Sequence, residues 1–309
     1  MKTVVTGATG FIGRALTARL LAENHAVTVL SRDAGRAQKT LGSSVRCLDW
    51  GSGDDSAWRE EVRAADVVFH LAGESVAGER WTPEYKTRLI ESRTDSTRLL
   101  VDTGLTGVFV CASAVGYYGD RGDDVIVETD PPGDDFLARL CVAWEGEANR
   151  AAVLPGVRVV TPRIGIVFGR GGGPLQSILH PPGSPIPPYK WGLGGPLGSG
   201  RQWVPWVHLH DLVEMFLRAA TDVRLRGAFN AVAPNPVTSA DLSHAIGRVY
   251  NKPAVIAVPE FALKAALGEF AYALLYSQRV APTVLQEAGF TFRFGDVDSA
   301  LRDLLTDGK

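Results

Sequence analysis

Short runs of β-branched and apolar residues alternate with longer amphipathic stretches along the first 165 residues of the chain. Such runs predict strands, and apolar residues that recur every three or four positions predict helices. The predicted strands are residues 2–6, 26–31, 45–48, 67–70, 108–111 and 157–161, and the predicted helices include residues 11–23, 84–103 and 136–152. This order is typical of repeated βαβ units, in which helices cover both faces of a parallel sheet.

The pattern changes at Gly169, because residues 169–200 are too rich in Gly and Pro for a continuous helix or a central strand. Such a segment is either a linker or a cover over a ligand. Apolar Trp191 and Leu193 interleave with the glycines, which favours the cover, since a linker would be polar. Beyond it the sequence predicts a helix over 211–220, a strand over 228–232, a helix over 239–250, a strand over 254–258 and a mostly helical remainder over 260–309.

The fold class expected from this order is α/β, with a Rossmann-type doubly wound parallel sheet and a smaller C-terminal α/β lobe that would bind a substrate. We assign residues 1–168, together with about 207–225, to the nucleotide-binding domain. Residues 169–206 and 226–309 form the expected lobe.

Composition narrows the class of protein. The chain has 309 residues, of which 45% are hydrophobic and 21% charged, as is usual for soluble globular proteins. The net charge of −2 leaves no broad basic field for a nucleic acid or a membrane, so we expect neither partner. None of the three cysteines lies in a C-x-x-C pattern, which is typical of metal and redox sites. We therefore expect no metal site and a protein of a reducing compartment. No apolar run reaches membrane-spanning length and the chain starts directly in a strand, so we expect a cytoplasmic protein, either a monomer or a homodimer.

The strongest chemical signal is a glycine-rich turn that follows the first strand and opens the first helix. Gly7 would allow the tight turn, Gly10 would let backbone amides approach a pyrophosphate, and Gly13 would let the helix pack on the sheet. The helix N-terminus offers unpaired N–H groups and a partial positive charge for the phosphates. The sequence therefore predicts a dinucleotide on Gly7, Thr9, Gly10, Phe11 and Ile12.

The end of the second strand bears on which nicotinamide nucleotide binds, because an acid there binds the ribose 2′-hydroxyl and an arginine accommodates a 2′-phosphate. The strand ends in Ser31 and Arg32, which favours NADP or NADPH with Arg32 on the phosphate. Asp33 lies 20 residues past the glycine motif and is the alternative, as an acid that would favour NAD.

The ends of the third and fourth strands should complete the cofactor wall. Trp50 is placed to meet the adenine, and Leu71, Ala72 and Gly73 form a turn of small and apolar residues beside the dinucleotide. His70 ends an apolar run, and no other metal-ligand residue stands at metal spacing from it. It is therefore interpreted as a core residue rather than a metal ligand.

Several further segments carry a resemblance that covers nearly the whole chain. They are Thr6–Gly13, His70–Gly73, Ser113–Gly119, Trp144–Glu145, Pro162–Gly165, Gly169–Gly173, Leu193–Gly200, Pro205–His208 and Asn230–Pro234. The first three resemble the extended short-chain dehydrogenase/reductases of the nucleotide-sugar epimerase and dehydratase type. Together the segments are similar to the atypical "epimerase family" oxidoreductases of that superfamily, which carry a C-terminal domain of unknown function. The resemblance implies an NADP-binding fold.

The chain departs from this family where the chemistry is usually done. The usual Tyr and Lys, four residues apart on a helix, are absent, and Cys141 stands where the Lys is expected. The remaining catalytic candidates are Ser113, Tyr117 and Tyr118 after the fifth strand. A phenol needs a nearby cation to act as a base at neutral pH, and Arg121 and Arg163 are the candidates.

Two further departures weaken a nucleotide-sugar substrate. Ile166 stands where the family has Asn, and Val204 stands where it has Arg. The lobe instead offers aromatic residues and a cation for a mostly apolar ligand with an anionic or carbonyl group. These candidates are Trp191, Arg201, Trp203 and Trp206. The tryptophans could equally fill the core of the lobe.

These features lead to two hypotheses. The first is an NADP(H)-dependent oxidoreductase or isomerase that acts on a small carbonyl or hydroxyl compound without the usual Tyr-Lys dyad. The second is a non-catalytic protein that binds NADP(H) as a redox sensor or partner-binding module.

Overall fold

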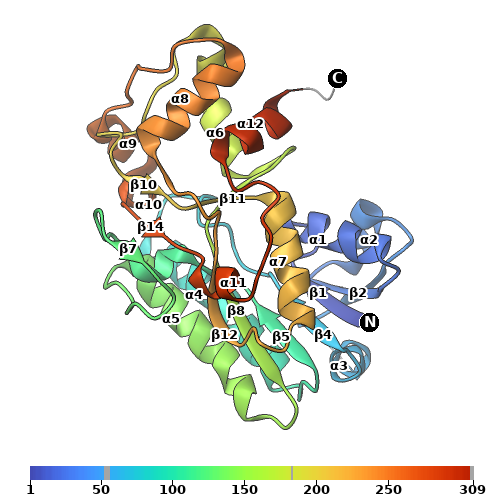
Figure 1. Ribbon diagram of the computed structural model, residues 1–309. Coiled ribbons are helices and arrows are strands. Elements are labelled where there is room, and N and C mark those ends of the chain that lie inside the picture. The colour runs from blue at the N-terminus through green and yellow to red at the C-terminus, as the bar shows by residue number, and fades with distance from the viewer. Residues whose placement is uncertain (52–55, 182–183, 307–309) are drawn as a thin grey trace.

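The computed structural model describes residues 1–51, 56–181 and 184–306 and is built around one parallel sheet (Figure 1). Its strands lie in the order β12-β8-β5-β4-β1-β2-β3, and the short β6 (Ser113–Ala114) pairs with β8 beside β5. The main strands are β1 (Lys2–Thr6), β2 (Ala26–Ser31), β3 (Arg46–Asp49), β4 (Val67–His70), β5 (Val108–Cys111), β8 (Arg158–Ile164) and β12 (Gly227–Ala231). All pairs are parallel, and the chain changes direction across the sheet between β1 and β4. In such sheets ligands bind at this switch point, outside the carboxyl ends of the strands.

Helices cover both faces of the sheet because successive strand residues point to opposite sides. Val5 packs under α1 (Phe11–Ala22), α2 (Ala34–Leu41) and α7 (Leu209–Thr221). Val4 packs under α3 (Ser56–Arg63), α4 (Pro83–Val101) and α5 (Phe136–Asn149). The predicted doubly wound α/β fold is confirmed.

The C-terminal part forms a lobe with its own core, around Phe168, Trp206 and Ile246. Two small sheets belong to it, a parallel pair of β9 and β11 and an antiparallel pair of β10 and β13. Its elements are β9 (Ile166–Phe168), α6 (Gly173–Leu179), β10 (Trp203–Val204), β11 (Trp206–His208), β13 (Val237–Thr238), α8 (Ser239–Tyr250), α9 (Glu260–Leu267), α10 (Ala271–Leu275) and α12 (Val297–Leu305).

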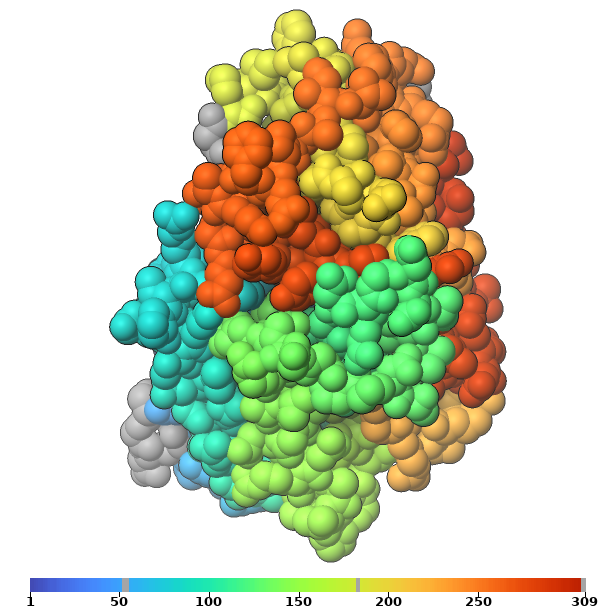
Figure 2. All heavy atoms as spheres, turned by 90° about the vertical axis from the view of Figure 1, so that its left-hand side faces the viewer, coloured from blue at the N-terminus to red at the C-terminus, as the bar shows by residue number. Residues whose placement is uncertain are grey.

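The segment after α10 connects the lobe to the domain that contains the main sheet. There β14 (Arg279–Val280) pairs with β7 (Val125–Ile126), and α11 (Thr283–Glu287) packs on β12. The side chain of Gln278 donates to the backbone carbonyls of Val115 and Gly119, beyond the carboxyl end of β5. The space-filling view shows the orange lobe segment lying directly against the green residues around β7 (Figure 2). The lobe therefore lies at the ligand-binding edge of the sheet.

Two expectations about the C-terminal strands were wrong. The segment 228–232 was assigned to the lobe, but β12 extends the main sheet beside β8. The strand expected over 254–258 forms only a bridge between Val258 and Leu197. Its partner is the glycine- and proline-rich segment, which accepts backbone hydrogen bonds from Ile256 at Gly194 and from Val258 at Pro196. Pro196 has no N–H group to donate in return.

Among the described residues, no helix has both the length and the apolar character needed to cross a membrane.

Candidate functional site

The glycine turn between β1 and α1 is shaped by close backbone approaches. Gly7 has φ +68°, and a Cβ on it would lie 2.7 Å from the backbone carbon of Leu71. A Cβ on Gly13 would overlap the carbonyl oxygen of Gly7 and lie 2.7 Å from the Cα of Ala8. Gly10 caps α1 without any side chain over the helix end. The turn thus leaves the N–H groups of the helix start open to an anion, which fits a dinucleotide pyrophosphate.

The adjoining wall after β4 is held by Thr6. Its Oγ1 accepts hydrogen bonds from the backbone N–H groups of Leu71 and Ala72, both at 3.2 Å. His70 behind it is fully buried, and its two ring nitrogens contact Thr6 Oγ1 and Ser96 Oγ. Burial lowers the pKa of His70 to about 3, so the ring is neutral at pH 7. The interpretation of His70 as a core residue is confirmed.

The start of the glycine-rich segment lies over the first turn of α1. Cβ atoms on Gly169 and Gly172 would lie 2.7 Å and 3.0 Å from ring atoms of Phe11. These glycines therefore let the chain cross the Phe11 ring directly. This contact places residues 169–173 beside the proposed phosphate site, as a covering segment would require.

At the end of β2, the acidic candidate Asp33 and the basic candidate Arg32 have different surroundings. The carboxylate of Asp33 accepts from the backbone N–H of Arg36 and caps α2. Arg32 is exposed, and the ion pairs found among the described residues do not include it. The Asp33 carboxylate is thus engaged in the local fold, whereas the Arg32 side chain extends into solvent beside the half-buried Ser31.

Trp50, the predicted adenine contact, is half-buried. Its ring lies edge-on to Trp58 and His70, with centroid distances of 6.1 Å and 6.2 Å. One part of the indole thus belongs to the core, and the exposed remainder is what an adenine could contact.

A buried polar network lies at the carboxyl ends of β5 and β8. Glu145 on α5 forms a two-point ion pair with Arg163 on β8, with both N–O distances 2.9 Å. Ser113 donates to the same carboxylate at 2.6 Å, and Arg163 donates to the Tyr118 hydroxyl at 2.9 Å. Tyr118 in turn donates to Asn230 Oδ1 on β12 at 2.6 Å. The network therefore ties three elements of the sheet edge to α5.

The three predicted catalytic hydroxyls differ in their burial and in their contacts with this network. Those of Ser113 and Tyr118 are buried and held by protein groups, and burial raises the pKa of Tyr118 to about 12. The half-buried Tyr117 has the Arg163 guanidinium over its ring at 3.4 Å from the centroid. Arg163 thus supplies the cation beside both tyrosines, while the Nε of Arg121 donates to the Tyr118 carbonyl.

We expect Tyr118→Phe to lower the free energy of unfolding by about 1–3 kcal/mol, because it leaves Asn230 and Arg163 each short of one buried partner. Tyr117→Phe is the matched control, since its hydroxyl has no hydrogen bond to the described residues, and its effect should stay within about 0.5 kcal/mol. Urea unfolding of both variants measures the difference. Equal effects would show that the network does not hold Tyr118.

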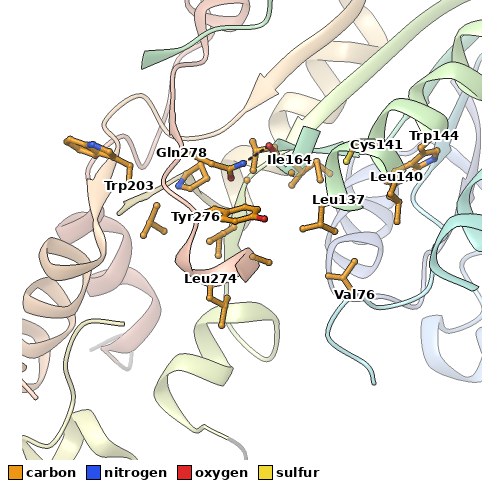
Figure 3. Close-up of a pocket in the computed structure, with 18 of the residues that line it drawn as sticks. Val76, Leu137, Leu140, Cys141, Trp144, Ile164, Trp203, Leu274, Tyr276 and Gln278 are labelled. Carbon is orange, nitrogen blue, oxygen red and sulfur yellow. Dashed lines mark hydrogen bonds between the residues drawn. The ribbon is translucent and has the colours of Figure 1, made fainter. Parts of the chain in front are cut away.

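Next to this network a cavity of about 180 Å³ opens between the main-sheet domain and the lobe (Figure 3). One wall comes from α5 and the ends of β5 and β8, and the other from the segment that ends α10. The Tyr276 ring reaches in from the lobe, with its hydroxyl directed towards Leu137. The lining also includes Arg93, Cys141, Trp144, Trp203 and Gln278.

Two family comparisons bear on these features. Residues 3–231 match the NAD dependent epimerase/dehydratase family, and residues 258–304 match a domain of unknown function, DUF1731. The first match covers more than half of the chain, including the glycine turn and the network. The chain belongs to the NAD dependent epimerase/dehydratase family.

Relatives in this family match nearly the whole chain. "Epimerase family protein SDR39U1 homolog, chloroplastic" from Arabidopsis thaliana is 39% identical over 99% of this chain and 87% of its own length. "Epimerase family protein YfhF" from Bacillus subtilis is 34% identical over 100% of this chain and 99% of its own. The crystal structure of human epimerase family protein SDR39U1 (isoform 2) with NADPH has a TM-score of 0.84 and 32% identity, covering 98% of this chain and 99% of that one. The chain is therefore an NAD(P)-binding family member.

At the dyad positions on α5, this member of the epimerase/dehydratase family has Cys141 and, four residues earlier, Leu137. Both line the cavity. Burial raises the pKa of Cys141 to about 12, so its thiol stays protonated at neutral pH. Neither residue supplies a base or a cation there. Ile166 and Val204, the two other departures from the family pattern, line the same cavity.

The structure separates the four predicted substrate residues. Trp203 lines the cavity, with its indole N–H donating to Asp123. Trp206 is 1% exposed and stacks on Phe168 in the lobe core, so its assignment to a ligand wall was wrong. Trp191 is 66% exposed, and neither it nor the exposed Arg201 is among the residues that line the cavity.

Sequence reasoning missed Arg93, Tyr276 and Gln278. Each lies in an ordinary amphipathic or irregular stretch, and only tertiary packing brings them to one cavity. The available signal for Arg93 was weak: an arginine among the inward-facing positions of a helix, between the buried Leu89 and Thr97.

Proposed function

We propose that this chain is an NADP(H)-dependent oxidoreductase or isomerase that acts on a small carbonyl or hydroxyl compound in the cavity described above. The observation that carries the proposal is the position of that cavity. It opens at the carboxyl ends of β5 and β8, along the edge of the sheet where the glycine turn would bind the dinucleotide. The lobe would supply the opposite wall, as a substrate-binding unit. Bound NADPH supplies a hydride.

The chain's own residues would hold the dinucleotide along this edge. The open N-terminus of α1 would bind the pyrophosphate, and the exposed part of Trp50 would contact the adenine. The proposed contacts are Gly7, Thr9, Gly10, Phe11, Ile12, Ser31, Arg32, Trp50, Leu71, Ala72 and Gly73. NADPH in the crystal structure of the human relative supports this assignment.

The preference for NADP over NAD is proposed from the end of β2. An acid that binds the ribose hydroxyls must direct its carboxylate at the nucleotide, and Asp33 directs its Oδ1 at the backbone of α2 as the cap of that helix. The exposed guanidinium of Arg32 can reach a 2′-phosphate and bind it through two N–H groups.

Thermal melting with NADP, NADPH, NAD and NADH tests this. We expect the phosphorylated pair to stabilise the protein, by about 2.7 kcal/mol at 100 times Kd. Arg32→Ala should weaken NADP binding about tenfold or more and leave NAD binding unchanged, because only NADP carries the phosphate. Lys39→Ala, an exposed cation at the other end of α2, is the control. Equal loss for both nucleotides would refute the role of Arg32.

A proton donor or acceptor for the substrate oxygen is also needed, and we propose a phenol. The hydroxyls of Ser113 and Tyr118 are engaged in the buried network, so Ser113 would act by holding Glu145 in place and Tyr118 by holding Arg163. Two tyrosines remain as donors. Tyr276 lines the cavity, whereas Tyr117 lies under the Arg163 guanidinium and follows the lining residue Gly116 without being a lining residue itself. Replacing the responsible tyrosine with Phe should abolish turnover while nucleotide affinity is kept.

The second candidate is a non-catalytic NADP(H)-binding sensor. It is favoured by Leu137 and Cys141, which leave the usual dyad positions without a proton-transferring group. Loss of NADPH absorbance in a screen of small aldehydes, ketones and oxo acids would support the enzyme. NADPH binding that alters association with a partner, without turnover, would support the sensor.

A further inference from the structure

Arg93 on α4 is a half-buried cation, and it forms no ion pair with a carboxylate among the described residues. Its two terminal nitrogens donate to the backbone carbonyls of Leu89 and Glu74, both at 2.9 Å. Its Nε is buried and has no hydrogen-bond partner among the described residues. Ion pairs between the described residues do not involve Arg93, although Arg88 on the same helix pairs with Glu79. Three of the five N–H groups of a guanidinium are therefore left over.

Two fully buried arginines have their side chains matched by protein groups. Arg163 is neutralised by Glu145. Arg158 donates three hydrogen bonds to backbone carbonyls, of Ala219, Ala220 and Leu225. Neither borders the cavity, whereas Arg93 lines it. A partly desolvated guanidinium without an ion-pair partner is stabilised when an anionic ligand binds beside it.

The surroundings of Arg93 hold it in place. Its guanidinium carbon lies 5.1 Å from the centroid of the Trp144 ring, a cation–π contact. On another side it abuts Gly73, where a Cβ would lie 3.1 Å from the same carbon. The guanidinium is thus positioned between the proposed cofactor wall and the substrate cavity, and the rest of the nearby lining, such as Val76, Leu137 and Leu140, is apolar.

The size of the cavity limits what can accompany the anionic group. A cavity of about 150 Å³ holds one benzene molecule, and this one measures about 180 Å³. A ring or short chain with a single small substituent fits it.

We propose that the cavity binds a small monocarboxylate, with Arg93 as the residue that binds the carboxylate and the apolar wall enclosing the remainder. This inference rests on the proposed function, for which it names the substrate class: a small oxo or hydroxy acid. The Tyr276 hydroxyl, which also points into the cavity, is placed to meet the oxo or hydroxyl group.

The first test compares benzoate with nitrobenzene on the unmodified protein by isothermal titration calorimetry. The two probes have nearly the same shape and differ in charge. We expect benzoate to bind about tenfold more tightly, because it alone can form charge-assisted hydrogen bonds with the guanidinium. Equal affinities, or a preference for nitrobenzene, would overturn the proposal without any variant being needed.

The second test uses Arg93→Met, which keeps an unbranched side chain and removes the charge. We expect its benzoate affinity to fall about tenfold, to that of nitrobenzene, while nitrobenzene binding shows that the cavity is intact. Arg88→Met, an exposed position on the same helix, is the control and should keep the preference. Should Arg93→Met not fold, Arg93→Gln takes its place in the same comparison. A preference that persists without the arginine would overturn the proposal.

A third experiment, with and without nucleotide, distinguishes failure of this proposal from failure of the function on which it rests. Benzoate binding is measured without nucleotide and again with NADPH. If no nucleotide binds but benzoate binding depends on Arg93, the carboxylate site stands and the proposed function fails. If Arg93→Met weakens NADPH binding and leaves the benzoate preference unchanged, Arg93 belongs to the cofactor site and the carboxylate site is refuted.

Discussion

Glu145→Gln is expected to lower the free energy of unfolding by about 3–5 kcal/mol. The substitution preserves the shape of the side chain and removes the negative charge that faces Arg163. The two side chains are 9% and 5% exposed, so water cannot replace the lost carboxylate. Arg163 would then remain as a buried cation, and Ser113 would lose a charged acceptor. Urea unfolding monitored by tryptophan fluorescence measures the change.

Glu147→Gln is the matched control for this experiment. It lies on the same helix, two residues further on, and pairs with Arg98 and Arg150, whose side chains are each 47% exposed. Exposed pairs contribute little, so its effect should not exceed about 1 kcal/mol. If the two variants were equally stable, the buried network would not be a structural support of the site.

The second large effect is expected from Gly13→Ala. A Cβ at this position would overlap the carbonyl oxygen of Gly7, which the strand and the helix hold on both sides. The turn must shift to make room, at a cost of about 1–3 kcal/mol in stability. Because the same turn would bind the pyrophosphate, we also expect a loss of about tenfold or more in NADPH affinity. Chemical unfolding and nucleotide titration measure the two effects separately.

Gly146→Ala is also a change from glycine to alanine, but we expect it to change the stability in the opposite direction. Gly146 lies inside α5, is exposed, and has open space where a Cβ would be placed. Alanine there should stabilise the protein by about 0.5–1 kcal/mol, since glycine is a poor helix former. NADPH affinity should not change. A Gly13→Ala variant that folds and binds NADPH like the unmodified protein would contradict the close approach of α1 to the turn.

The glycine turn was predictable from the sequence because it is a local structure. A strand, three glycines and an amphipathic helix follow one another within about 20 residues. Each glycine is required by a different feature of the local backbone. His70 was also assigned correctly, since an apolar strand predicts burial. The network was only partly foreseen: Arg163 was named as a cation near the tyrosines, but its partner Glu145 is an ordinary helix residue in the sequence.

The lobe shows where pattern reasoning fails. Trp203 and Trp206 stand three positions apart, yet one lines the cavity and the other fills the core. The difference arises from which strand faces which neighbour, and a sequence pattern of two short strands does not contain it. Likewise the strand pattern of 228–232 was correct, but whether it joined the lobe or the main sheet depended on pairing with β8.

The sequence by itself determined the doubly wound sheet, the alternation of Val4 and Val5 between its two faces, and the glycine turn. These features depend on interactions between residues close in the chain and on the period of apolar positions. Only the tertiary structure decided that Ser113, Glu145, Arg163 and Asn230 form one network, and that Arg93 and Tyr276 face one cavity. The reason is physical: those contacts join residues from 18 to more than 100 positions apart, and which side chains meet is set by packing of whole elements rather than by local preference.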